Sequence, residues 1–329
     1  MPQESVVHTL VKLIQFVIMI WLFGISALVL MILFATILFP LFLAIESLIC
    51  LTSAVAVYQE RKIWLDPKLP SLTVVGMIKV FLLNVVWMTV CGLGALATAI
   101  EAALTNHWLD LKHTRKLAHL VVERRCAMMV TKMFVGPVII EGAENLPAEE
   151  PGSPAPIYVA NHSSQIDSAA VYFIQRQWRW IMKSSIMFLP GVGQCTYLGD
   201  HIWIDRNRKK NKSKDSITGA RNLYVKSDIS VQEGVPMFFF PQGTRRMGER
   251  LPFKDGAYKV AKNNGSQLIP ISINIPPMAW NSLYPFAKAE PVVLTIHKAV
   301  ESKDKDIETL KKETSDVIYS VLPDYSKQD

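Results

Sequence analysis

A histidine and an aspartate stand five residues apart in the segment NHSSQID at residues 161–167. On a regular helix, two residues at this spacing point about 140° away from each other and could not cooperate. A strand ending near Ala160, with a helix beginning at Asp167, would instead let the carboxylate fold back onto one nitrogen of His162. The aspartate would then fix the ring tautomer of a general base. The alternative is that Asp167 only caps a helix over residues 168–174 and His162 is an ordinary loop residue.

Two further segments contain groups suited to binding an anion. Arg206 closely follows the apolar run 202–204, where a planar guanidinium can hold a phosphate through two hydrogen bonds. After the apolar run 237–240 come Gly243, which permits close backbone approach, the hydroxyl of Thr244, and Arg245. Alone, this second segment could be a turn with a surface arginine. Together with the histidine, the two segments predict a phosphate site beside a general base.

The elements that must position these residues follow from the hydrophobic pattern after residue 135. Short apolar runs predict strands at 138–140, 157–160, 202–204, 237–240, 268–273 and 292–296. Helix-length stretches lie near 168–178, 214–233 and 255–264, and residues 304–322 have an amphipathic helical pattern. This alternation predicts an α/β fold, a β-sheet flanked by helices, with functional groups on loops at the strand ends.

The N-terminal third has a different composition. Residues 13–45 contain no charged side chain, and a second uncharged run spans 80–100. Because about 20 apolar residues can cross a bilayer, we expect residues 1–104 to form two, or possibly three, membrane-anchoring helical segments. A buried helical hairpin in a soluble protein is the alternative. Residues 105–132 mix cations with leucine and valine, which predicts a basic amphipathic helix on the bilayer surface, and residues 133–329 would be the catalytic domain.

The formal net charge of +7 suggests an anionic partner, and membrane phospholipid accounts for it as well as nucleic acid does. No zinc-finger spacing or aromatic-rich RNA-binding signature accompanies the charge, so we expect no nucleic-acid partner. The four cysteines are far apart in the sequence, which predicts neither a disulfide framework nor a metal site.

Four blocks occur in a fixed order: NHSSQID, then KSSIMFLPGVG with GDHIWIDR, then FPQGTRR, then LIPISI. This set resembles the sequence blocks of the glycerolipid acyltransferases, most closely the 1-acyl-sn-glycerol-3-phosphate acyltransferases, over about residues 130–275. The chain departs from the family pattern at Gln242, where the third block commonly has glutamate.

The resemblance implies an enzyme that transfers a fatty acyl group from acyl-CoA or acyl-carrier protein to the sn-2 hydroxyl of 1-acyl-glycerol 3-phosphate, giving phosphatidic acid. His162 would deprotonate the hydroxyl while Asp167 holds the imidazole, with no cofactor, metal or acyl-enzyme. Lys183 and Arg245 would bind the acceptor phosphate, with Arg206 close by. The implied substrate-binding residues are Lys183, Arg206, Gly243, Thr244 and Arg245.

The implied partners are the phospholipid bilayer, lysophosphatidic acid and the acyl thioester donor. We expect an integral membrane protein with a cytosolic catalytic domain, in the endoplasmic reticulum of a eukaryote or the inner membrane of a bacterium. Gln242 leaves open an acyltransferase for glycerol 3-phosphate or for another lysophospholipid. A membrane-anchored lipid-binding protein without turnover is the rival from a different class.

Overall fold

The computed structural model describes residues 74–105, 111–148, 154–164, 166–189, 191–204, 214–245, 250–280 and 289–323, together with positions 37, 40, 41 and 44. The chain divides into two compact units, residues 1–68 and 69–329, and every element described below belongs to the second. The expected membrane segment at 13–45 falls almost wholly outside the described residues, so it stays a prediction.

A seven-stranded sheet runs through the second unit in the order β1-β7-β6-β2-β5-β3-β4. From β6 to β4 all neighbours are parallel, whereas β7 runs antiparallel to β6. The carboxyl ends of β6, β2, β5, β3 and β4 therefore lie along one edge of the sheet. The strands are β1 (Val138–Glu141), β2 (Ile157–Ala160), β3 (Arg179–Lys183), β4 (Ile202–Ile204), β5 (Met237–Phe239), β6 (Leu268–Asn274) and β7 (Val292–Ile296).

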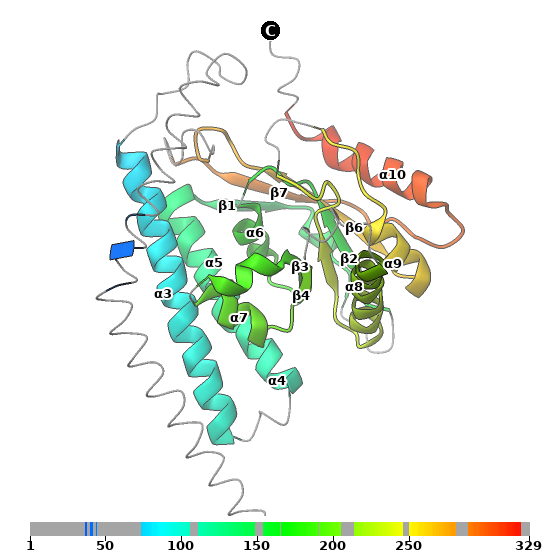
Figure 1. The fold of residues 1–329 in the computed structure, drawn as a ribbon. Coiled ribbons are helices and arrows are strands. Elements are labelled where there is room, and N and C mark those ends of the chain that lie inside the picture. The colour runs from blue at the N-terminus through cyan, green and yellow to red at the C-terminus, as the bar shows by residue number, and fades with distance from the viewer. Residues whose placement is uncertain are drawn as a thin grey trace, which may run out of the picture. The chain divides into compact units, whose positions relative to one another are not determined.

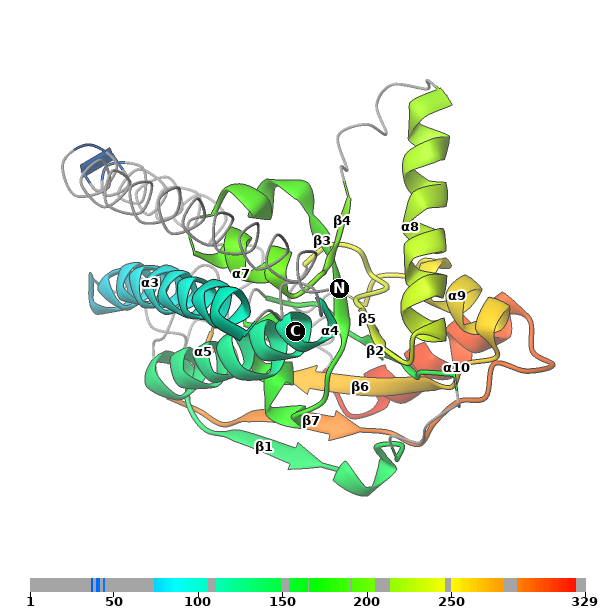
Figure 2. The ribbon, with the colours of Figure 1, turned by 90° about the horizontal axis from the view of Figure 1, so that it is seen from below.

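Helices cover both faces of this sheet (Figures 1 and 2). On one face lie α3 (Val74–Thr105), α4 (Leu111–Lys116), the π-helix η2 (Leu117–Glu123), α5 (Arg124–Val130), the π-helix η3 (Thr131–Val135), α6 (Asp167–Ala170) and α7 (Val192–Leu198). On the other lie α8 (Lys214–Gln232), α9 (Gly256–Asn264) and α10 (Ile307–Ser320). Short 3₁₀ turns are η4 (Ala143–Asn145), η5 (Val171–Ile174) and η6 (Ser184–Phe188).

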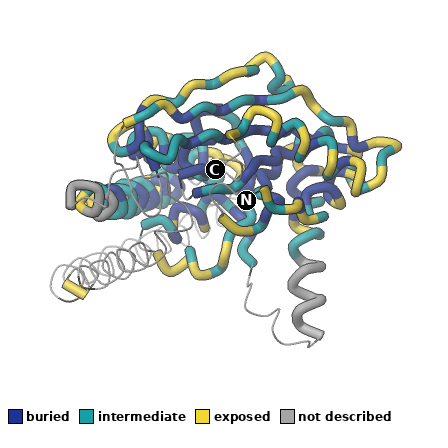
Figure 3. The backbone as a smooth tube through the Cα atoms, turned by 90° about the horizontal axis from the view of Figure 1, so that it is seen from above, coloured by how far each residue is buried: buried dark blue, intermediate teal, exposed yellow. Residues whose placement is uncertain are grey.

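Two hydrophobic cores result from the alternation of side chains along the strands. In β2, Tyr158 and Ala160 face the core shared with α5, while Ile157 and Val159 face the core shared with α9 and α10. The central strands are consequently buried on both faces (Figure 3). The predicted α/β fold, with a sheet flanked by helices, is confirmed.

All six predicted strands are present, and β3 is a seventh that was not predicted. The helix predicted over 168–178 is wrong in its second half, because η5 ends at Ile174 and Gln175 adopts a left-handed φ of 59°. Trp178 and Trp180 then bury large rings in the core as the chain becomes extended. A five-residue strand with a single tryptophan, preceded by a polar stretch, gave too weak a periodic signal.

The second uncharged run, residues 80–100, lies within α3. Its segment Leu82–Thr105 is long and apolar enough to cross a membrane, and among the described residues no other helix meets that test. One stripe of α3, which includes Leu83, Cys91 and Ala95, is buried, whereas Leu93 and Leu104 on another stripe are exposed. Thus α3 packs against α7, η2 and α5 and presents an apolar face outward, while its membrane crossing stays a prediction.

The basic segment predicted at 105–132 is helical where it is described, from residue 111 onward. Lys116 and Arg125 are exposed, as expected for a solvated or headgroup-facing side. The opposite side is buried and carries, besides alanine and valine, the polar residues His119 and Glu123. The amphipathic helix thus serves as packing for the sheet, and its contact with the bilayer remains a prediction.

Candidate active site

The segment between β2 and α6 has the geometry expected of a general base. His162 Nδ1 lies 2.9 Å from Oδ2 of Asp167, and the same oxygen accepts hydrogen bonds from the backbone N–H groups of Ser163 and Ser164 at 2.7 and 2.8 Å. Asp167 is fully buried, while 16% of the His162 side chain is exposed. Asp167 is the first residue of α6, but its carboxylate turns back toward the loop. This arrangement favours the general-base interpretation over a helix cap.

The start of this loop is fixed to the neighbouring strand by Asn161. Its side-chain Nδ2 donates to the carbonyl of Ile273 at 2.9 Å, and the N–H of Ile273 donates to Oδ1 at 2.7 Å. The buried amide therefore continues the pairing between β2 and β6 beyond the last residue of β2. Asn161 was not predicted as a site residue, although its position directly before His162 was a signal.

Two residues that follow β5 contact His162 directly. The ring of Phe240 stacks on the imidazole, with centroids 4.0 Å apart and planes inclined by 10°. The backbone N–H of His162 donates to Oε1 of Gln242, which is buried. Gln242 therefore supports the loop of the base, and its oxygen fills an acceptor role that a glutamate oxygen could also fill.

The loop from Gln242 to Arg245 turns at Gly243, whose φ of +70° lies in the left-handed region. A Cβ atom at Gly243 would collide with Nζ of Lys254, so the lysine lies against the glycine backbone. Thr244 and Arg245 are exposed at the same turn. Lys254 thus joins Arg245 beside the loop. It was not predicted as a site residue, although its place in the FKDG segment, shortly after this loop, was a signal.

Lys183 is the last residue of β3, which is hydrogen-bonded to β5, and its side chain is exposed. It therefore lies at the same edge of the sheet as His162 and the 242–245 loop. Arg206 lies outside the described residues, two positions beyond the end of β4. The structure thus places every described site residue predicted from sequence at one sheet edge.

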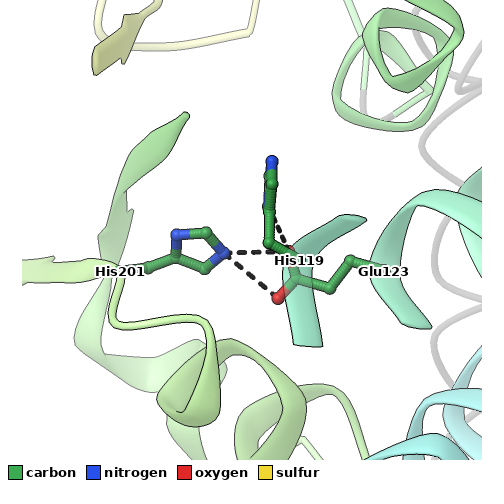
Figure 4. A group of neighbouring side chains, drawn as sticks. All are labelled: His119, Glu123 and His201. Atoms are coloured by element: carbon green, nitrogen blue, oxygen red, sulfur yellow. Dashed lines mark hydrogen bonds and ion pairs between the residues drawn. The ribbon is translucent and has the colours of Figure 1, made fainter. Parts of the chain in front are cut away.

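A second polar group, which the sequence analysis did not single out, lies inside the domain. His119 and Glu123 from η2 and His201, just before β4, are all buried and joined by hydrogen bonds (Figure 4). Their signal in the sequence was weak, since a histidine and a glutamate four residues apart on a helix commonly form a solvated pair.

Residues 137–274 match the family model described as Acyltransferase. A 1-acyl-sn-glycerol-3-phosphate acyltransferase of Chlamydomonas reinhardtii is 32% identical over 64% of this chain and 60% of its own length. One from Salmonella typhimurium is 33% identical over 36% of this chain and 46% of its own. The chain therefore spans about half to three fifths of the length of these relatives.

The crystal structure of the 1-acyl-sn-glycerophosphate (LPA) acyltransferase PlsC from Thermotoga maritima superposes with a TM-score of 0.55 at 22% identity, over 74% of this chain and 95% of that one. At this identity the likeness establishes the fold. The family match covers β1 to β6 and every described residue of the predicted site. Residues 137–274 therefore match the Acyltransferase family model, within a fold that the PlsC structure shares.

Proposed function

We propose that this protein acylates the sn-2 hydroxyl of 1-acyl-glycerol 3-phosphate with an acyl thioester, giving phosphatidic acid. The pairing of His162 with the buried Asp167 supports it most directly. The names of the Chlamydomonas and Salmonella relatives support the choice of acceptor. Gln242 no longer argues for a different acceptor, because its side chain contacts the loop of the base.

The chemistry follows from the tautomer of the imidazole. Because Nδ1–H donates to Asp167, the lone pair lies on Nε2, which can accept the proton of the acceptor hydroxyl. The hydroxyl oxygen then attacks the thioester carbonyl, the C–S bond breaks, and the thiol leaves with a proton returned by the imidazolium. Asp167 stabilises the imidazolium during the transfer.

The acceptor phosphate would bind beside this base, at the cationic sheet edge. Lys183 and Arg245 are the proposed ligands, Arg206 would add a third cation, and Gly243 and Thr244 would shape the turn that faces the phosphate. Lys254, against Gly243, is a further cation at that turn. Guanidinium and ammonium groups suit a phosphate monoester because charge-assisted hydrogen bonds are about twice as strong as neutral ones.

The apolar stripe of α3 and the cations of residues 111–135 would hold the domain at a bilayer, where both the acceptor and the product reside. The acceptor would then reach His162 without complete transfer into water. We therefore propose a membrane location, with the catalytic domain on the cytosolic side that basic juxtamembrane residues favour.

The test is an assay of the purified full chain with a panel of acceptors: lysophosphatidic acid, glycerol 3-phosphate, and lysolipids with larger headgroups. Each acceptor is offered with acyl-CoA and with acyl-carrier protein, and ester formation is measured. We expect lysophosphatidic acid to give the highest kcat/KM and His162→Ala to lose ester formation. Equal rates for His162→Ala and the wild type would disprove the proposal.

A further inference from the structure

The buried polar group under β3 is a closed set of hydrogen bonds centred on Glu123 (Figure 4). His119 Nδ1 lies 2.9 Å from Oε2 of Glu123, and His201 Nε2 lies 2.9 and 3.1 Å from its two oxygens. The hydroxyl of Tyr172 donates to the same carboxylate at 2.6 Å. Burial alone would raise the pKa of Glu123, but the hydrogen bonds that it accepts from His119 and His201 lower it. The carboxylate is therefore charged and fully engaged.

The other nitrogen of each histidine ring faces the backbone of the β3 segment. The N–H of Trp178 donates to Nε2 of His119 at 3.3 Å, and the N–H of Trp180 donates to Nδ1 of His201 at 3.2 Å. Each ring must then be neutral and must carry its proton on the nitrogen that faces Glu123. Burial lowers the pKa of His119, in agreement with a neutral ring.

These fixed tautomers decide between two roles for the group. A histidine and carboxylate cluster of this size could hold a metal ion, but the ligand nitrogens would have to present lone pairs toward Glu123. The protons would then move to the nitrogens that face Trp178 and Trp180, where two N–H groups would point at each other. The geometry therefore favours an internal support for β3 over a metal site.

A continuous line of contacts leads from this support to the base. The indole Nε1 of Trp180 donates to the hydroxyl oxygen of Tyr172 at 2.9 Å. The ring of Trp180 stacks on Phe240 at 5.6 Å and 17°, and Phe240 stacks on His162 at 4.0 Å and 10°. The rotamer of Trp180 is thus fixed by Tyr172, which Glu123 holds in turn.

We propose that Trp180 is a positioning residue for His162, acting through Phe240 and held by Tyr172 and Glu123. This positioning role rests on the proposed function of the protein. With Asp167 holding one edge of the imidazole and Phe240 covering one face, the ring keeps the orientation in which Nε2 meets the acceptor. If Phe240 could change its rotamer, the Asp167 contact would be the main restraint on the orientation of the imidazole. The kcat would then fall, while the binding of the acceptor phosphate would stay the same.

The experiment compares Trp180→Leu with Trp178→Leu. Both tryptophans are buried in the same aromatic core, where the Trp178 ring contacts Tyr158, Phe238, Tyr172 and the edge of Trp180. Of the two, Trp180 is the one that stacks on Phe240 and donates to the Tyr172 hydroxyl, and Trp178→Leu leaves those two contacts in place. Rates are normalised to the folded fraction, measured by circular dichroism at the assay temperature. We expect Trp180→Leu to lower kcat by about tenfold or more with little change in KM for lysophosphatidic acid. Trp178→Leu should keep the kcat of its folded fraction, and Trp180→Phe, which retains a ring, should recover most of the rate.

A readout independent of turnover separates this proposal from the proposed function. The Nδ1 proton of His162 should give a downfield NMR resonance in ¹⁵N-histidine-labelled protein, assigned by its loss in His162→Ala. We expect that resonance to broaden in Trp180→Leu and to persist in Trp178→Leu, whether or not phosphatidic acid forms.

Equal effects of the two leucine substitutions on kcat and on the resonance would overturn the positioning role. So would a stoichiometric metal ion in the purified protein whose removal by chelator loosens the fold, because that would require the opposite tautomers.

Discussion

The imidazole of His162 is held by groups from two other parts of the chain. Asp167 from α6 accepts a hydrogen bond from Nδ1, Phe240 after β5 covers one ring face, and Gln242 accepts a hydrogen bond from the backbone N–H of His162. A general base needs both the correct tautomer and the correct orientation. The Asp167 carboxylate fixes the tautomer, and the stacked ring of Phe240 and the loop held by Gln242 fix the orientation.

Asp167→Asn removes the charge that stabilises the imidazolium while keeping one oxygen as an acceptor. We expect kcat to fall by up to about 10⁴-fold, the loss seen when the aspartate that orients a histidine base is replaced by asparagine. The matched control is Asp255→Asn, because Asp255 pairs with Lys259 and Lys311 at the surface of α9. Steady-state kinetics at saturating lysophosphatidic acid would measure the kcat of both variants. An unchanged kcat in Asp167→Asn would show that the carboxylate takes no part in the mechanism.

Gly243→Ala tests the turn beside the proposed phosphate site. The new Cβ would collide with Nζ of Lys254, so the lysine must move, and the left-handed backbone adds about 1 kcal/mol of strain. Gly265→Ala is a matched control, since Gly265 has a φ of +63° and nothing within 4 Å of the added atom. We expect KM for lysophosphatidic acid to rise only in Gly243→Ala. Equal KM values in both variants would show that the displaced lysine does not contact the acceptor.

At the scale of the elements, β3 depends on groups that stand in for a missing neighbour. Its pairing with β4 begins at Ile181, so the backbone N–H groups of Trp178 and Trp180 lie beyond that ladder. The rings of His119 and His201 accept from them instead. The helix of residues 111–135 is thereby hydrogen-bonded to the sheet as well as packed on it.

This arrangement makes the stability of the domain sensitive to acid. The pKa of His119 is lowered from 6.5 in the fold by burial, so below about pH 6.5 the unfolded chain binds a proton that the folded chain does not. Stability contributed by the neutral ring is complete above that pH and is lost as the pH falls. The free energy of unfolding then changes by up to about 1.4 kcal/mol per pH unit.

Denaturant unfolding of the wild type and His119→Gln at pH 7.5, 6.5 and 5.5 would measure the effect. Glutamine lacks the titration, so the variant should be less stable at pH 7.5 and lose less stability on acidification. Parallel pH profiles for the two proteins would show that His119 does not take up a proton on unfolding.

At the scale of the second unit, apolar and cationic surfaces coexist. The exposed stripe of α3 carries leucine and isoleucine, while residues 111–135 expose lysine and arginine on the side away from the sheet. A bilayer surface offers both hydrocarbon and anionic headgroups. Residues 69–329 therefore carry surfaces suited to the interface where a lysolipid acceptor resides.

Lys116→Glu and Arg125→Glu should weaken the binding of the full chain to vesicles that contain anionic phospholipid, by about fivefold for each neutralised charge and more for reversal. The difference should shrink at high salt because the attraction is screened. Lys303→Glu is the control, since this exposed lysine precedes α10, which Figure 1 shows at the far end of the unit from α4. Vesicle co-sedimentation would measure binding, and equal losses for all three variants would show that only net charge matters.

The sequence by itself determined the strands that alternate cleanly and the loops that follow them. The strands β2 and β5 were predicted to within one residue, because buried apolar runs bounded by polar turns leave little choice. That placement also located His162, Asp167 and the 242–245 loop at strand ends. Most residues of the candidate site could therefore be predicted from their short-range spacing in the sequence.

Only the tertiary structure decided which residues meet across the sheet. Gln242 reaches the backbone of His162, Phe240 stacks on its ring, and Lys254 lies against Gly243, because β2 and β5 are hydrogen-bonded neighbours. Strand order depends on packing between segments distant in the chain, and no local pattern encodes it. For the same reason the buried group around Glu123 was invisible beforehand, since its partners come from η2, η5 and the residue before β4. The sequence named the base, and the arrangement of the sheet determined what holds it.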